Sequence, residues 1–118
     1  MQVSQLVLNV NSEQPDRLIT FYRDVVGLQP NPAIGPGAFV VGGAMFMIDG
    51  HSDVKGATKE PPRVLINFWV DDLAAEQKRI KAAGAKFIRE SGKEEWGGTL
   101  STFLDPDGNY LQLLEYKP

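Results

Sequence analysis

The apolar residues of this chain follow two different periods, and the same order of periods occurs twice. The runs Leu6–Val10 and Ile66–Val70 are both strand-like, and each leads through a helix-capping residue into a helical stretch. Each half then returns to extended, glycine-punctuated segments that end in an apolar strand, at residues 44–49 and 109–115. A period of roughly half the chain indicates that two similar units make up the protein.

The first helical stretch is predicted to begin after Ser12, a good N-cap residue, with Pro15 in its first turn. Gly27 is predicted to end this helix as a left-handed residue. A second helix is predicted in the other half, with Asp72 as its N-cap and Gly84 at its end. Apolar residues recur at three- and four-residue spacing in the first stretch, at Leu18, Phe21, Tyr22, Val25 and Val26. This spacing predicts an amphipathic helix that covers a sheet.

Glycine and proline divide the remaining sequence into strands and turns. The predicted strands are 38–41 and 44–49 in the first half and 86–90, 100–104 and 109–115 in the second. The segment 105–108, Asp-Pro-Asp-Gly, is a well-specified reversal, because proline presets the turn and glycine accepts positive φ. The polar stretch 50–63 is interpreted as a linker. We therefore predict one domain, residues 1–118, made of two βαβββ modules at about residues 1–55 and 62–118.

Composition narrows the possible functions. The chain has a net charge of −3 and no basic cluster, so nucleic acid is not an expected partner. The absence of cysteine removes disulfides, thiolate nucleophiles and cysteine-ligated zinc together. No apolar run approaches the ~20 residues that a membrane span requires. A cytoplasmic protein without a membrane partner is therefore expected.

Five motifs in this order resemble the vicinal oxygen chelate superfamily, which includes glyoxalase I, bleomycin-resistance proteins and extradiol dioxygenases. The segments that carry the resemblance are 5–10 (QLVLNV), 21–28 (FYRDVVGL), 68–72 (FWVDD), 82–84 (AAG) and 105–109 (DPDGN). The resemblance implies an α+β fold in which two βαβββ units form an open mixed-sheet half-barrel, with a ligand held between the halves. It also implies that two short chains of this kind form a homodimer.

Enzymes of the superfamily hold a divalent metal with four side chains, and the motifs place Gln5, Met47, Leu65 and Gln112 at these positions. Some members use glutamine at the first position. The other three residues are a soft thioether, a side chain without a lone pair and a neutral amide, whereas such cations prefer anionic oxygen or imidazole ligands. We therefore expect no metal and no cofactor.

Strand alternation predicts the residues that face the ligand. If Gln5 and Gln112 face the cavity, that face mixes amides, aromatic rings and thioethers, while the opposite face is uniformly apolar and suits packing under the helices. A half-polar surface of this kind is typical of a small-molecule pocket. The predicted ligand-binding residues are Gln5, Val7, Asn9, Met45, Met47, Leu65, Asn67, Trp69, Tyr110 and Gln112.

Several of these residues have a second interpretation. Met45 and Met47 can be core filler, and Trp69 can fill the barrel mouth or a dimer contact. The amides can satisfy one another across the barrel. Trp96 can be a flap over the pocket or an anchor of its hairpin.

Catalytic candidates are few. Asp49 is a weak candidate for a general base, since a strand-end carboxylate near a loop is usually exposed. His51 is the single histidine, and among Asp49 and Asp53 it is interpreted as a solvated loop residue rather than a metal ligand. No Gly-x-Ser-x-Gly elbow accompanies it.

The leading hypothesis is a metal-free protein that binds a small organic ligand, partly aromatic or amphipathic, as in the drug-binding, bleomycin-resistance-like branch of the superfamily. The alternative is a glyoxalase-like lyase or dioxygenase-type enzyme with an atypical site, or a metal-independent isomerase or hydrolase that uses Asp49. A third possibility is an interaction module whose cavity is filled by its own side chains.

Overall fold

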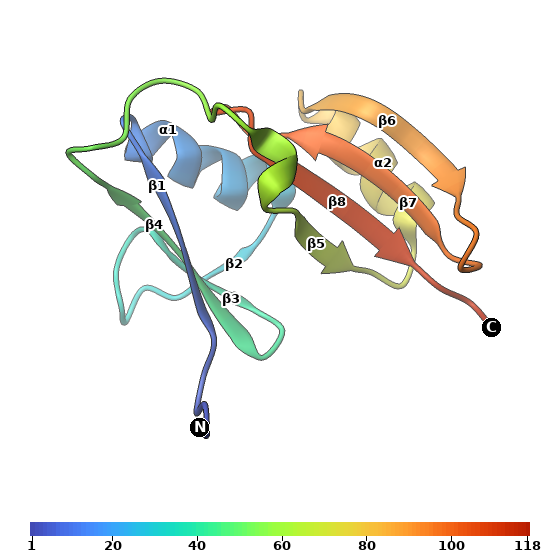
Figure 1. Ribbon diagram of the computed structural model, residues 1–118, viewed down its shortest axis with the longest axis horizontal. Coiled ribbons are helices and arrows are strands. Elements are labelled where there is room, and N and C mark those ends of the chain that lie inside the picture. Colours follow the sequence, from blue (N-terminus) through green and yellow to red (C-terminus); the bar gives the residue numbers. More distant parts are fainter. The chain divides into compact units, whose positions relative to one another are not determined.

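Two compact units make up the chain, Met1–Gly56 and Ala57–Pro118, in a computed structural model that describes all of residues 1–118. Each unit contains one open four-stranded mixed sheet with a helix against one face (Figure 1). The order of elements is β-α-β-β-β in both. The predicted α+β class with two βαβββ units is therefore confirmed.

Unit 1, the N-terminal unit, has the strand order β1-β4-β3-β2. The edge strand β1 pairs in parallel with β4, and the remaining neighbours are antiparallel. The helical segment lies against β1 and β4. The elements are β1 (Val7–Ser12), α1 (Pro15–Thr20), the π-helical η1 (Phe21–Val26), β2 (Gln29–Pro30), β3 (Ala38–Val41) and β4 (Ala44–Gly50).

Unit 2 repeats this plan with the strand order β5-β8-β7-β6. Here β5 and β8 are the parallel pair, and the helix lies against β6, β7 and β8. The strand predicted at 86–90 extends further along the chain and has register shifts on both sides of Arg89. The elements are η2 (Pro61–Arg63), β5 (Ile66–Trp69), α2 (Leu73–Ala82), β6 (Lys86–Lys93), β7 (Thr99–Leu104) and β8 (Tyr110–Glu115).

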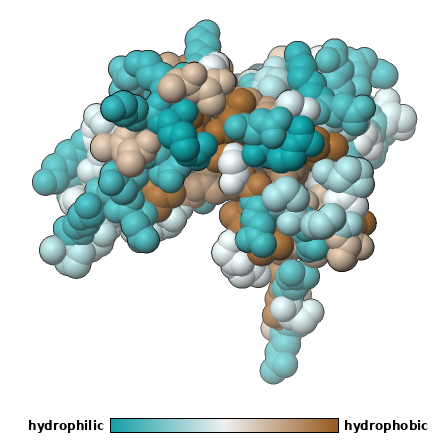
Figure 2. All heavy atoms as spheres, turned by 180° about the vertical axis from the view of Figure 1, so that it is seen from behind, coloured by the Kyte–Doolittle hydropathy of each residue, from teal (hydrophilic) through white to brown (hydrophobic).

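The core of each unit lies between the helix and the sheet face that it covers. In unit 1, the ring of Tyr22 packs on that of Phe46 with centroids 4.7 Å apart. The largest fully buried apolar side chains are Tyr22, Phe39, Phe103, Leu18, Leu73, Ile80, Leu111 and Leu113. The surface seen in Figure 2 is mostly hydrophilic, with scattered apolar groups. None of the helices is both long and apolar enough to cross a membrane.

The first helix begins later than predicted and changes its winding. Ser12 is the last residue of β1, where its pairing with Gly50 of β4 keeps the backbone extended, and its hydroxyl accepts the Gln14 N–H at 2.9 Å. The prediction of Ser12 as the N-cap is therefore wrong, because Gln14 occupies that position and makes no side-chain cap bond. The first helical segment ends where predicted, at Gly27, which has a φ of 84° and donates its N–H to the Tyr22 carbonyl at 3.1 Å.

The second helix has the predicted cap, since the Asp72 carboxylate accepts the Ala75 N–H at 3.1 Å. Asp72→Ala leaves that donor without its partner and is expected to lower the free energy of unfolding by about 1 kcal/mol. Asp72→Asn keeps an acceptor oxygen and is expected to be nearly neutral. Urea unfolding followed by circular dichroism measures both. Equal stability of the alanine variant and the parent would show that this cap does not contribute.

Candidate functional site

In unit 1, the sheet face opposite the helix brings four of the predicted ligand-binding residues together. The parallel register of β1 and β4 sets Val7 beside Met45 and Asn9 beside Met47. The Asn9 Nδ2 donates to Asp49 Oδ2 at 2.8 Å, so the weak general-base candidate is held by an amide. Val7 and Asn9 are exposed, whereas the two methionines are half-buried.

Gln5 and Leu65 lie just before the paired segments of β1 and β5. Gln5 precedes β1 and is exposed, and Leu65 precedes β5 with 43% of its surface exposed. On the adjacent parallel strand, the neighbour of Met47 is Asn9 and that of Gln112 is Asn67. The two residues taken from the motif positions on β4 and β8 are therefore each paired with an asparagine.

Unit 2 carries a group of polar side chains on the sheet face opposite its helix. Asn67 on β5 and Thr102 on β7 flank Gln112 on β8, and the Gln112 Nε2 donates to Thr102 Oγ1 at 3.0 Å. Asn67 is exposed, Gln112 is half-buried and Thr102 is buried. The sequence argument missed Thr102, although alternation along 99–104 places it on one face with Leu100. Tyr110 is the first residue of β8, opposite Leu104, and lies on the same face as Gln112, two residues before it.

Three aromatic residues continue this surface and are called the aromatic cluster here: Trp69 at the end of β5, Trp96 in the β6–β7 turn, and Tyr116 just after β8. The Trp96 ring centroid lies 5.9 Å from that of Trp69 and 6.1 Å from that of Tyr116. Their exposed fractions are 64% for Trp69, 48% for Trp96 and 47% for Tyr116. Each of these side chains therefore keeps about half or more of its surface exposed.

The backbone of the turn holds Trp96 in place. A side chain at Gly98 would overlap the six-membered part of the Trp96 ring, so glycine is required for the ring to lie over the hairpin. Trp96 therefore covers its own turn and also belongs to the exposed aromatic cluster. The Trp-Gly-Gly sequence was the available signal for this packing.

The polar group and the aromatic cluster are close enough to contact one molecule. Asn67 and Trp69 are two residues apart on β5 and point to the same face, which separates their Cα atoms by about 7 Å. Gln112 and Leu114 repeat this step on β8, with Tyr116 next along the chain. Polar groups that can orient a ligand thus stand beside rings that can stack on it. We call Asn67, Thr102, Gln112 and the aromatic cluster the unit 2 face.

The side chains at the motif positions do not fit a divalent metal. Met47 offers a thioether, Leu65 has no donor atom, and Gln112 offers a neutral amide oxygen while its Nε2 donates to Thr102. No three His, Cys, Asp or Glu side chains come together. His51 lies in an exposed loop after β4, where its Nδ1 accepts the Asp53 N–H at 3.1 Å.

Paired βαβββ units, each with a helix-covered sheet face and an opposite face that carries polar side chains, define a known class of proteins. The model of the Glyoxalase/Bleomycin resistance protein/Dioxygenase superfamily matches residues 3–113, and the chain belongs to this superfamily.

Two lyases are among the similar sequences. The lactoylglutathione lyase of Haemophilus influenzae is 29% identical over 99% of this chain and 94% of its own length. A probable chloroplastic lactoylglutathione lyase of Arabidopsis thaliana is 44% identical over 50 residues. This matched segment is 42% of this chain and 14% of that protein.

Solved structures share the fold at lower identity. TioX from Micromonospora sp. ML1 is 21% identical with a TM-score of 0.74, covering 98% of this chain and 100% of its own. A glyoxalase/bleomycin resistance protein/dioxygenase family enzyme from Burkholderia phytofirmans PsJN is 20% identical with a TM-score of 0.76, covering 94% and 97%.

Proposed function

We propose that this protein is a metal-free small-molecule-binding member of the superfamily, similar to its bleomycin-resistance-like branch. Its ligand is a small organic molecule that is partly aromatic or amphipathic. The observation that carries this proposal is the unit 2 face, where Trp69, Trp96 and Tyr116 are exposed beside Asn67 and Gln112. A contiguous exposed apolar patch next to oriented polar groups is typical of a binding surface.

The chemistry of the face favours a planar ligand. Aromatic pairs contribute roughly 0.5–1.5 kcal/mol beyond the apolar area that they bury, and more than one ring of the aromatic cluster is open for contact. Asn67 and Gln112 provide amide donors and acceptors that fix the orientation of a polar substituent. The bond from Gln112 to Thr102 restrains the glutamine rotamer before binding, which lowers the entropic cost of contact.

The metal-free part of the proposal rests on donor chemistry. Gln5, Met47, Leu65 and Gln112 supply no carboxylate and no imidazole, so zinc, manganese, nickel and iron(II) have no anionic shell at these positions. The homodimer and the cytoplasmic location are further parts of the proposal that rest on the superfamily resemblance and the composition.

Intrinsic fluorescence provides a direct test, because the two tryptophans of the chain both belong to the aromatic cluster. We expect saturable emission changes on titration with planar heteroaromatic compounds, such as substituted quinolines and naphthols. Cyclohexanol and similar aliphatic compounds serve as controls and are expected to give none. No saturable change with any aromatic compound up to millimolar concentration would remove the basis for the proposal.

The second candidate is a lyase, favoured by the similarity to lactoylglutathione lyase along almost the whole chain. Retitration of metal-stripped protein with zinc, manganese, nickel and iron(II) separates the two candidates. The binding-protein proposal predicts no stoichiometric uptake and no rise in melting temperature with any of them. One tightly bound ion per chain, with formation of lactoylglutathione from methylglyoxal and glutathione, would favour the lyase instead.

A further inference from the structure

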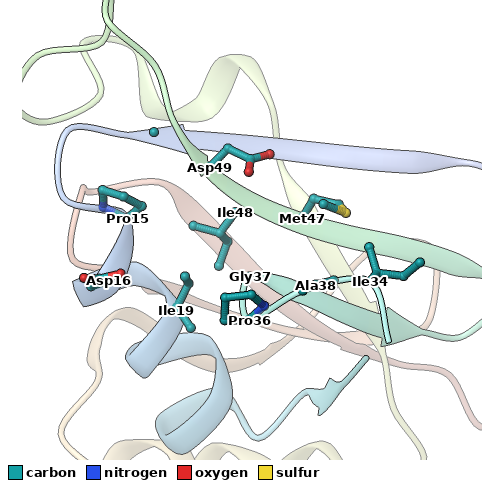
Figure 3. A pocket seen from close by; sticks show the side chains of 12 residues that line it. Pro15, Asp16, Ile19, Ile34, Pro36, Gly37, Ala38, Met47, Ile48 and Asp49 are labelled. Carbon is teal, nitrogen blue, oxygen red and sulfur yellow. The ribbon is translucent and has the colours of Figure 1, made fainter. Parts of the chain in front are cut away.

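Unit 1 contains a cavity of about 340 Å³ between the start of α1, the loop before β3 and the end of β4 (Figure 3). Apolar cavities of about 150 Å³ already hold a benzene-sized molecule, so this volume admits a compact organic ligand. The cavity is remote in sequence from the unit 2 face and is independent of the proposed function. Its walls are formed by Pro15, Asp16, Ile19, the segment 34–38 and the segment 47–50.

One face of α1 forms the first wall. Pro15 and Ile19 are four residues apart, so they lie on the same face of the helix. A Cβ atom on Gly50 would lie 3.6 Å from the Pro15 Cγ. A Cβ atom on Gly37 would lie 3.3 Å from the Ile19 Cδ1. This face of α1 therefore follows β4 from Gly50 to the loop at Gly37, and Figure 3 shows Ile19 and Ile48 pointing toward each other.

The loop forms the second wall and is held by backbone hydrogen bonds. The Asn31 N–H donates to the Ala38 carbonyl at 2.8 Å, and the Ala38 N–H donates to the Gly35 carbonyl at 3.2 Å. The Ile48 N–H donates to the Gly37 carbonyl at 2.8 Å, which joins the loop to β4. Glycine is required at position 37, because a Cβ atom there would overlap the carbonyl oxygen of Ile48. A pocket with a fixed wall loses little entropy when a ligand enters.

A backbone donor of β4 is left without a neighbouring strand where the loop turns away at Gly37. Backbone N–H groups alternate between the two sides of a strand, and the Met45 N–H donates to the segment before β1. The N–H groups of Ile48 and Gly50 therefore point to the side of β3. Ile48 donates to the loop, whereas the pairing of β3 with β4 does not reach position 50. The Gly50 N–H is thus available at the cavity, which Gly50 lines.

The charged lining side chains favour a neutral ligand. Asp16 is exposed on α1, and Asp49 accepts a hydrogen bond from Asn9 on the sheet face away from α1. No Lys, Arg or His lines the cavity, so an anion would meet repulsion without a counter-charge. A cation would find no pair of converging carboxylates to offset the loss of its hydration.

We propose that this cavity binds a compact neutral carbonyl compound, such as a small cyclic ketone or lactone. The apolar body of the ligand lies against Pro15, Ile19 and Pro36, and its carbonyl oxygen accepts the Gly50 N–H. The donor belongs to the backbone of a strand, so this contact needs no side-chain rearrangement. Because the net contribution of one hydrogen bond is modest, the apolar walls supply the larger share of the affinity and the Gly50 N–H fixes the orientation.

The test uses the full chain labelled with ¹⁵N and two probes of nearly equal shape, cyclohexanone and methylenecyclohexane. Cyclohexanone is expected to give saturable shifts at the amides of Gly35, Gly37 and Gly50, which line the cavity. The Gly50 amide proton is expected to move downfield as it bonds to the carbonyl oxygen. Methylenecyclohexane has no acceptor and is expected to shift the wall amides without this downfield movement. The tryptophan indole N–H signals are expected to stay unchanged with cyclohexanone, which separates this cavity from the unit 2 face.

A third probe tests the preference for a neutral ligand. Cyclohexanecarboxylate is expected to bind at least about fivefold more weakly than cyclohexanone, because its charge must be desolvated beside Asp16. Equal binding of the carboxylate, no saturable shift at the three glycines, or the same movement of the Gly50 proton with both neutral probes would each overturn the proposal.

Variants of Ile19 test the helix wall. Ile19→Val removes the Cδ1 atom that faces Gly37 and is expected to weaken cyclohexanone binding by about twofold to threefold. Ile19→Ala removes more of the wall, and a loss of about threefold to tenfold is expected. The amide signals of residues outside the cavity show in the same spectra whether each variant is folded. Ile88→Ala truncates an exposed isoleucine of unit 2 and is expected to leave binding unchanged. Unchanged binding in Ile19→Val and Ile19→Ala, or an equal loss in Ile88→Ala, would contradict the site.

Discussion

Asp105→Ala is expected to lower the free energy of unfolding by about 3 kcal/mol, because charge-assisted hydrogen bonds contribute about 1.5–3 kcal/mol each and are not additive. The carboxylate is buried, with 4% exposed, in the turn between β7 and β8. It accepts the backbone N–H of Asp107 at 2.9 Å, the backbone N–H of Asn109 at 3.0 Å and the Asn109 side-chain amide at 2.8 Å. Removing it leaves these donors without an acceptor in a buried turn.

Asp105→Asn is the matched variant for this prediction. Asparagine can keep the oxygen that serves both backbone N–H groups but places an amide NH2 against Asn109. We therefore expect an intermediate loss of stability. Chemical denaturation followed by circular dichroism measures all three proteins. A loss below about 1 kcal/mol for the alanine variant would show that the turn is stabilised by other contacts.

The turn also matters for the candidate site. The antiparallel register of β7 and β8 sets Thr102 beside Gln112 and Leu104 beside Tyr110. A slip by one residue would move these side chains to the opposite face of the sheet. If Asp105→Ala remains folded but slips in register, ligand titration will show weaker binding together with lower stability.

Trp69→Ala is expected to weaken binding of planar aromatic ligands by about tenfold to hundredfold, which corresponds to a loss of about 1.4–2.7 kcal/mol of binding free energy. Trp69 is 64% exposed, so removing its ring should change the free energy of unfolding by less than about 0.5 kcal/mol. Separate measurements of affinity and stability therefore distinguish a ligand contact from a structural role. The emission of Trp96 remains available for the titration.

Two controls accompany this prediction. Trp69→Phe keeps a stacking ring and is expected to retain most of the affinity. Ile88→Ala removes another exposed apolar side chain, on β6 and outside the aromatic cluster, and is expected to have no effect. Unchanged affinity in Trp69→Ala would place the ligand elsewhere and remove the main observation behind the proposed function.

The fold class was predictable because its signals are local. Apolar spacing predicted the helices, and the Asp72 cap, Gly27 and the turn at 105–108 marked boundaries that the structure retains. Ser12 was misassigned because its side chain suits an N-cap as well as the bond to Gln14 that it makes. Pairing of β1 with β4 decided between these outcomes, and that pairing is not a local property.

The candidate site was predictable only in part. Alternation along strands placed Asn67, Trp69 and Gln112 on one face, as the register requires. It did not indicate that Gln112 donates to Thr102, or that strand pairing begins only after Gln5 and Leu65. These details depend on which residues face each other across strands, and turns and bulges set that register.

The sequence by itself determined the two-unit βαβββ plan and the types of side chain at the motif positions, because periodicity and residue chemistry are properties of the chain. The tertiary structure decided that Trp69, Trp96 and Tyr116 form one cluster, and that segments around residues 15, 35 and 48 enclose a cavity. Residues far apart in the sequence meet only when strand register and helix docking bring them together, and these depend on packing of the whole unit.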